Sequence, residues 1–265
     1  MLEGMLDFLK SWFIYPGLPL SLMLIGIGLA IVFGAIWLLG HWPPLFKRYW
    51  FWAVAVVSAF LALAAVTFIQ IPLQVLAGQA LGSFWSQEIL LSWILLAGIP
   101  QILLSGLVQE GAKMVPMVVW WWRQGRNLGP RLGLAIGAVA GAGFGIYEAV
   151  WAHNQIFAAG WTWQAVEAGG FWMLAGFWER FFAVAFHIAA SALAGYGLAK
   201  GWGWQFYLIA SCLHALLNYS AVLLNAGVIT AIQLELYAAV VAVLVTASAL
   251  WLRWRKTEEL AELEV

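Results

Sequence analysis

The chain has 265 residues, of which 65% are apolar and only 9% are charged. Soluble domains carry roughly 25% charged residues, so this composition excludes a water-soluble enzyme. The twelve basic and twelve acidic side chains cancel, and no basic patch occurs, so we expect no nucleic-acid partner. The composition indicates a multi-pass protein embedded in a lipid bilayer, which we expect to be a prokaryotic cell membrane.

A helix that crosses a membrane needs about 20 apolar residues, and the sequence predicts seven such segments. Their approximate bounds are 18–40, 48–71, 88–122, 131–153, 175–199, 203–225 and 228–252. The third segment is too long for one upright helix, and Pro100 and Pro116 favour a bend, a tilt or a helix that starts in the outer head groups. We therefore expect an all-α bundle of about seven transmembrane helices, formed by residues 1–265 as a single membrane domain.

Basic residues gather on one side of this seven-span arrangement. They lie between the spans or after the last one: Lys47, Arg48, Arg123, Arg126, Arg131, Lys200, Arg253, Arg255 and Lys256. Because cytoplasmic loops carry an excess of lysine and arginine, we expect the N-terminus outside the cell and the C-terminus in the cytoplasm. The nineteen tryptophans fit aromatic belts at the two membrane surfaces.

The fourth span carries glycines at strict four-residue spacing, namely Gly133, Gly137, Gly141 and Gly145. Small residues at this spacing let a neighbouring helix approach backbone to backbone. We therefore predict tight helix packing along this stripe.

Ionisable side chains within the spans are energetically costly and are candidates for a functional site. They are Glu110, Lys113, Glu148, His187, His214 and Glu235, accompanied by the uncharged Gln109 and Asn218. At 1.5 Å per residue, most of them lie about 15–26 Å from the basic ends of their helices. Four helices thus place polar groups in one layer near mid-membrane.

The spacing within each helix indicates that these groups face the bundle interior. Residues three or four positions apart share a helix face, as Glu110 and Lys113, His214 and Asn218, and the row His187, Ser191 and Gly195 do. We expect five residues to line one water-accessible cavity: Glu110, Glu148, His187, His214 and Asn218. Lys113 should pair with a carboxylate or with carbonyl groups in the bundle interior, and Glu179 and Arg180 should anchor the fifth span.

Structural roles remain open for each residue taken alone. Glu110 and Lys113 can form a merely neutralised pair, and a single intramembrane histidine or asparagine commonly bonds a neighbouring helix. The agreement in depth favours a shared site over such scattered contacts.

A carboxylate beside two imidazoles can bind a water molecule and take its proton, and an asparagine amide can donate to an oxyanion. These groups suit hydrolysis of a peptide bond. Alternatively, His187, His214 and Glu148 could hold a zinc ion with an open position, although the sequence contains no HExxH pattern. Ser191 lies one turn from His187, but no GxSxG-like segment supports serine catalysis.

Four short motifs on successive helices resemble those of PrsW- and YhfC-type intramembrane proteases. The segment from Gln109 to Lys113 resembles an EExxK motif, and Phe144 to Glu148 matches FxxxE. Glu179-Arg180 with His187 to Ser191 resembles the third element of the YhfC branch, and His214 to Asn218 matches HxxxN. Together they cover about residues 105–220, and their order is more specific than any one of them.

This resemblance implies a glutamate-dependent hydrolase acting within the bilayer, in the superfamily of the CAAX-prenyl endopeptidases. The superfamily is thought to include APH-1, the seven-span scaffold subunit of γ-secretase. The first motif would activate water, His187 would help to hold it, and His214 with Asn218 would stabilise the oxyanion.

Gln109 departs from the motif, because it stands where the family has the glutamate usually assigned as the base. Three explanations are open. Glu110 serves as the base, the glutamine is an engineered inactivating change, or the chain is a natural pseudo-protease.

Three functions follow from these observations. The first is an intramembrane endopeptidase of the glutamic or metallo type, acting on membrane-embedded or lipid-linked peptides. The second is an inactive, APH-1-like scaffold that binds other membrane proteins, and a homo-oligomer is compatible with either. The third is a proton-coupled transporter, which ranks last because the sequence shows no internal repeat.

Overall fold

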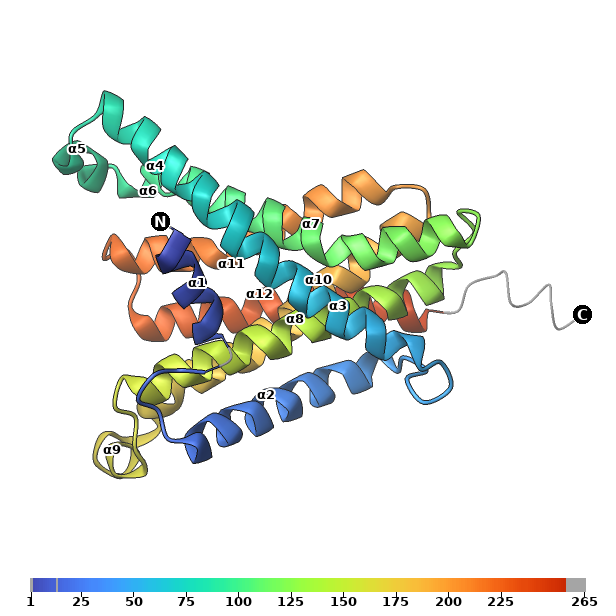
Figure 1. The fold of residues 1–265 in the computed structure, drawn as a ribbon, viewed down its shortest axis with the longest axis horizontal. Helices are drawn as coiled ribbons and strands as arrows, with labels where there is room; N and C mark the ends of the chain where they lie inside the picture. Colours follow the sequence, from blue (N-terminus) through green and yellow to red (C-terminus); the bar gives the residue numbers. More distant parts are fainter. Residues whose placement is uncertain (1, 13, 256–265) are drawn as a thin grey trace, which may run out of the picture.

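A computed structural model describes residues 2–12 and 14–255, and every regular element in these residues is helical. The predicted Lys256 and the acidic tail 257–265 lie outside the described residues. Seven stretches are long and apolar enough to cross a membrane, as predicted: Leu20–His41, Trp50–Phe84, Ile94–Arg123, Pro130–Ala158, Trp163–Ala199, Gly203–Asn225 and Ala231–Trp254. The long helices lie side by side along the length of the molecule (Figure 1).

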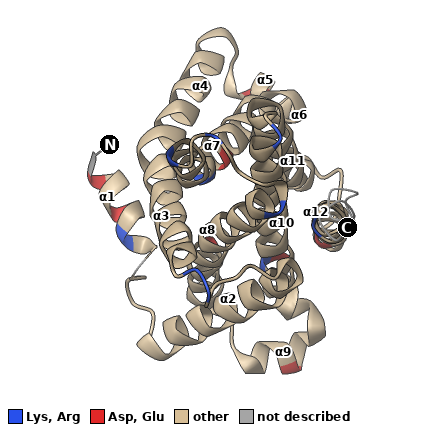
Figure 2. Cartoon of the chain, turned by 90° about the vertical axis from the view of Figure 1, so that its right-hand side faces the viewer, with Lys and Arg blue, Asp and Glu red and all other residues tan. Residues whose placement is uncertain are grey.

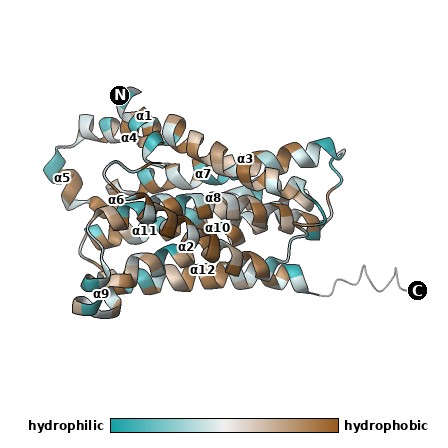
Figure 3. Cartoon of the chain, turned by 60° about the horizontal axis from the view of Figure 1, so that its bottom comes forward, coloured by the Kyte–Doolittle hydropathy of each residue, from teal (hydrophilic) through white to brown (hydrophobic). Residues whose placement is uncertain are grey.

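The helices in chain order are α1 (Leu2–Ser11), α2 (Leu20–His41), α3 (Trp50–Ala65), the π-helical turn η1 (Val66–Gln70), α4 (Ile71–Phe84), α5 (Gln87–Ser92), α6 (Ile94–Ala97) and α7 (Ile99–Arg123). They continue with α8 (Pro130–Ala158), α9 (Trp163–Gly169), the 3₁₀ turn η2 (Gly170–Leu174), α10 (Ala175–Ala199), α11 (Gly203–Asn225) and α12 (Ala231–Trp254). Apolar residues cover most of the bundle, and hydrophilic ones gather toward its ends (Figure 3).

The predicted end of the second span at residue 71 is wrong. The helix continues through η1 into α4 and ends only at Phe84. Pro72 cannot donate a backbone hydrogen bond, and the wider π-helical turn directly before α4 accommodates this interruption.

The third span begins later in the structure, at Ile94, than the predicted residue 88. Residues 87–97 form the short helices α5 and α6, and α7 begins at Ile99 with Pro100 in its first turn. Proline is tolerated there because the first helical N–H groups lack intrahelical partners. Pro100 therefore marks the start of a helix, whereas Pro116 lies inside α7.

The core of the bundle is the contact between α8 and α10, and α10 is buried along almost its whole membrane-spanning length. The glycine stripe of α8 makes this contact, as predicted. A Cβ atom added to Gly137 would lie 2.0 Å from the backbone oxygen of Ser191, and one added to Gly141 would lie 2.1 Å from that of His187. The two helix backbones are therefore in direct contact, and this contact places His187 beside α8.

Charged residues are few among the described helices (Figure 2). Most basic residues lie where the long helices meet the connections at one end of the bundle. We call this the basic end, where the helix ends and the connections carry Lys47, Arg48, Arg123, Arg126, Arg131 and Lys200, and where Arg253 and Arg255 lie at the end of α12. Helix α1 lies toward the other end (Figure 1), and Trp12 after it stacks on Trp151 of α8 with ring centroids 5.2 Å apart.

Candidate functional site

Four helices bring five of the six predicted ionisable residues together inside the bundle, whereas the sixth, Glu235, lies on α12. Glu110 and Lys113 lie on α7, Glu148 on α8, His187 on α10 and His214 on α11. Glu110, Lys113, His187 and His214 are between 0% and 3% exposed, whereas the side chain of Glu148 is 20% exposed. We call these five residues the polar cluster.

The first carboxylate–histidine pair joins α7 to α11. His214 Nδ1 lies 2.7 Å from Glu110 Oε1, and Lys113 Nζ lies 2.5 Å from the same oxygen. Since a carboxylate only accepts hydrogen bonds, Nδ1 of His214 is the donor to Glu110.

The second pair joins α8 to α10. His187 Nε2 lies 2.9 Å from Glu148 Oε2, and His187 Nδ1 lies 2.9 Å from Lys113 Nζ. An ammonium group only donates, so Nδ1 of His187 accepts from Lys113 and Nε2 donates to Glu148. Lys113 therefore connects both pairs, and of the two expected partners, a carboxylate or carbonyl groups, it has the carboxylate of Glu110.

Arg180 extends the network along α10. Its Nη1 lies 3.4 Å from Glu148 Oε2, and its guanidinium group also holds the adjacent Glu179 in a two-point ion pair. The sequence predicted that Glu179 and Arg180 anchor the fifth span. It gave no indication that Arg180 reaches Glu148, because this contact joins residues 32 positions apart.

Two phenylalanines pack around the cluster. The ring of Phe144 lies 4.9 Å from Lys113 Nζ and meets His187 edge-on at 4.8 Å. Phe186 contacts the rings of both histidines edge-on at 5.8 Å. The sequence indicated no role for either ring, although Phe144 is the first residue of the FxxxE motif.

The ring centroids of His187 and His214 lie 5.2 Å apart, so the α10 and α11 histidines are neighbours, as expected. The expectation of a water-accessible cavity is wrong for the described structure around Glu110, His187 and His214. These side chains are at most 3% exposed, because the aromatic rings and the small residues of α8 pack against them.

Gln109 and Asn218 lie beside the polar cluster and make other contacts. Gln109 Nε2 donates to Gln70 Oε1 of η1 at 3.0 Å, and Asn218 Nδ2 donates to Ser105 Oγ at 3.0 Å. Neighbouring residues of a helix point about 100° apart. Gln109 therefore lies on the face of α7 that meets η1, whereas Glu110 lies on the face that meets α11. Gln70 and Ser105 are polar partners that no motif had indicated.

Ser191 is fully buried at the α8–α10 contact, where its backbone oxygen faces Gly137. Its hydroxyl group has no hydrogen-bond partner among the described residues. This position agrees with a structural role in packing.

Three side chains of the cluster could hold a metal ion. One ligand atom each from Glu110, His187 and His214 lies within 4.8 Å of the others. Two imidazoles and one carboxylate are a donor set found in catalytic zinc sites, so the residues fit a divalent metal. The carboxylate of this group is Glu110, whereas the sequence suggested Glu148.

The fold and the site define a helical multi-pass membrane protein with a buried glutamate–histidine cluster. The model of the YhfC intramembrane metalloprotease family matches residues 164–242. The match covers α10, α11 and half of α12, and it therefore includes His187 and His214. No curated protein and no solved structure matches the chain. Over this part of its length, the chain is thus similar to YhfC-type membrane proteases.

Proposed function

We propose that the chain is an intramembrane endopeptidase that hydrolyses peptide bonds of membrane-embedded substrates at the polar cluster. The observation that carries this proposal is the convergence of Glu110, His187 and His214 from three helices to within 4.8 Å, at a depth where isolated ionisable groups are costly. The similarity to YhfC metalloproteases over residues 164–242 supports it independently.

Glu110 is the proposed general base. Its carboxylate can accept a proton from a water molecule, and the hydrogen bond from His214 keeps one of its oxygens oriented. Gln109 stands where the family has its base glutamate, but a glutamine amide cannot accept a proton at neutral pH, and the Gln109 amide donates to Gln70.

Lys113 is the proposed electrostatic partner. Its ammonium group contacts Glu110 and His187, and it can donate a hydrogen bond to the oxyanion that forms when a peptide carbonyl is attacked. Asn218 was predicted for this task, but its amide is bonded to Ser105. Glu148 orients His187 by accepting from Nε2.

A divalent metal would be held by Glu110, His187 and His214. When bound, it would supply Lewis acidity that lowers the pKa of a water molecule and polarises the scissile carbonyl. Lys113 Nζ lies 2.5 Å from Glu110 Oε1 and 2.9 Å from His187 Nδ1, so its ammonium competes with a metal for these two lone pairs.

Cleavage of a library of membrane-spanning peptides by the full chain in proteoliposomes tests the proposal. Glu110→Gln should reduce the rate by about 10²–10⁴-fold, since it removes the base but preserves the size of the side chain. Glu88→Gln is the matched control, because Glu88 is exposed on α5. Equal activity of the Glu110 variant and the parent chain would contradict the proposal. A parallel assay with added zinc or with EDTA distinguishes a metal-dependent hydrolysis from one in which Glu110 acts without a metal.

A further inference from the structure

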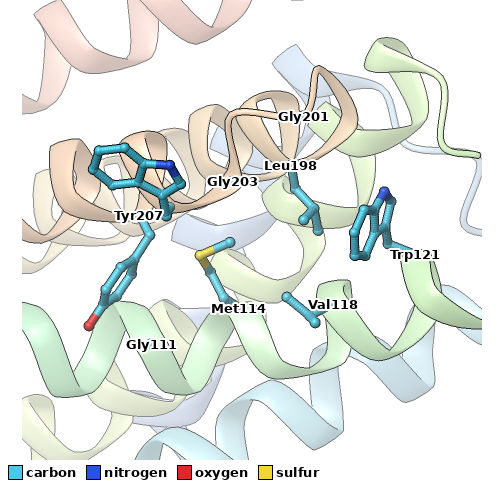
Figure 4. Close-up of a pocket in the computed structure, with 9 residues that line it drawn as sticks. Gly111, Met114, Val118, Trp121, Leu198, Gly201, Gly203 and Tyr207 are labelled. Carbon is cyan, nitrogen blue, oxygen red and sulfur yellow. The ribbon is translucent and has the colours of Figure 1, made fainter. Parts of the chain in front are cut away.

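A crevice opens between α7 and α11 toward the basic end of the bundle (Figure 4). Its volume of about 440 Å³ lies within the range of ligand sites, roughly 300–1,000 Å³. Met114, Val118 and Trp121 extend from α7, and Tyr207 reaches across from α11 (Figure 4). Apart from the tyrosine hydroxyl and the indole N–H, the side chains of these four residues are apolar.

The crevice follows from the way in which the two helices diverge. A Cβ atom added to Gly106 would lie 2.3 Å from the backbone oxygen of Ser211, so α7 and α11 touch at this point. Nearer the basic end, the hydroxyl group of Tyr207 spans the gap and donates to the backbone oxygen of Leu107 at 2.9 Å. Beyond Tyr207, the lining includes Met114, whose flexible side chain adapts to varied apolar partners.

Two basic residues lie next to residues that line this apolar space. The guanidinium carbon of Arg126 is 5.5 Å from the ring centroid of Trp121, which lines the crevice. Lys200 directly precedes Gly201, another lining residue, and both basic side chains are exposed. An apolar crevice flanked by basic residues is complementary to a molecule that has a hydrocarbon chain and an anionic end.

We propose that this crevice binds an anionic phospholipid, with one acyl chain between α7 and α11 and the phosphate group at Arg126 and Lys200. Basic pockets between transmembrane helices are known to bind acidic lipid head groups, and the crevice lies within the spans, where lipid chains surround the protein. The proposal does not depend on the proposed hydrolysis. Since α7 carries Glu110 and α11 carries His214, a bound chain contacts the two helices that form the first carboxylate–histidine pair.

The role of Arg126 and Lys200 can be tested with the delipidated full chain in detergent, titrated with phosphatidylglycerol or phosphatidylcholine and followed by native mass spectrometry. Each basic side chain contributes about fivefold to anionic-lipid affinity, so Arg126→Gln with Lys200→Gln should weaken phosphatidylglycerol binding about 25-fold. Lys47→Gln with Arg48→Gln removes the same charge from another connection at the basic end and should leave the affinity unchanged.

The crevice itself can be tested without changing charge. Val118→Trp should fill it and abolish binding of phosphatidylglycerol, whereas Val119→Trp, on the next exposed position of α7, should not. Equal affinity for the two lipids, equal losses in the two charge variants, or unchanged binding in Val118→Trp would overturn the proposal. Displacement of the bound lipid by an apolar membrane-spanning peptide would assign the crevice to a protein segment and would also overturn it.

Discussion

The α8–α10 and α7–α11 contacts each supply one carboxylate–histidine pair, but they are built differently. Glu148 and His187 stand on α8 and α10, whose backbones touch along the glycine stripe. Glu110 and His214 stand on α7 and α11, which touch near Gly106 and then diverge around a crevice of about 440 Å³.

The Glu148–His187 pair is therefore held by two helices in direct backbone contact. The Glu110–His214 pair is held by two helices with a crevice beside them. Separating α8 from α10 would break backbone contacts over several turns, whereas separating α7 from α11 enlarges a gap that already exists. We therefore expect the closed cluster to admit water or substrate from the α7–α11 side.

Loss of Lys113 should have the largest effect, because this residue connects both pairs. Lys113→Met removes the cation that contacts Glu110 and His187, and it leaves the buried Glu110 carboxylate with the hydrogen bond from His214 but without its ion pair. Breaking a buried ion pair costs about 3–5 kcal/mol, so a correspondingly lower thermal stability in detergent should follow. Lys10→Met is the control, since the Lys10–Asp7 pair is more than 70% exposed and should contribute less than about 1 kcal/mol. An unchanged melting temperature of Lys113→Met would show that the packing of Glu110, His187 and His214 does not depend on the ammonium group.

Adding one methyl group should distinguish the two contacts directly. Gly137→Ala puts a Cβ atom 2.0 Å from the backbone oxygen of Ser191, so the helices must separate at a cost of about 1–3 kcal/mol or more. Gly111→Ala faces the crevice, where the nearest atom, the hydroxyl oxygen of Tyr207, is 3.5 Å away. Because alanine favours a helix over glycine by about 1 kcal/mol, Gly111→Ala should be neutral or stabilising in the same melting assay. Equal destabilisation by the two changes would contradict the distinction.

Gln109→Glu tests whether position 109, rather than Glu110, is the position of the general base. The new carboxylate would face Gln70 in a buried position, and an unsatisfied buried acceptor costs about 1–3 kcal/mol. We expect lower stability with no gain in peptide cleavage. Gln233→Glu is the control, because Gln233 is exposed in the capping box of α12, where glutamate serves equally well. A large increase in cleavage by Gln109→Glu would instead assign the base to that position.

Tyr207→Phe should have the smallest effect. It removes the hydrogen bond to the backbone oxygen of Leu107, which spans the gap between α11 and α7, at a cost of about 0.5–1.5 kcal/mol. Hydrogen exchange should become faster in α7 beside the crevice and stay unchanged in α8. Tyr219→Phe removes a similar bond to Leu95 of α6 and should not change exchange beside the crevice. Faster exchange along α8 in the Tyr207 variant would show that the two contacts open together.

The sequence alone predicted much of this arrangement. Runs of apolar residues gave all seven spans, and the four-residue glycine spacing gave the tight contact of α8. Counting helical rise from the basic ends placed Glu110, Glu148, His187 and His214 in one layer, and the structure brings them into one network. These predictions succeed because span length, depth and helix face depend on local geometry and on the cost of exposing polar groups to lipid.

Only the tertiary structure decided how the helices are rotated against one another. The sequence could not show that Gln109 meets Gln70 while the adjacent Glu110 meets His214, because these partners lie on different helices. It also could not show that the second span continues through η1 to Phe84, or that Lys113 lies between the two carboxylate–histidine pairs. Neighbouring residues of a helix point about 100° apart, so a modest rotation set by packing against other helices determines which of them enters the cluster.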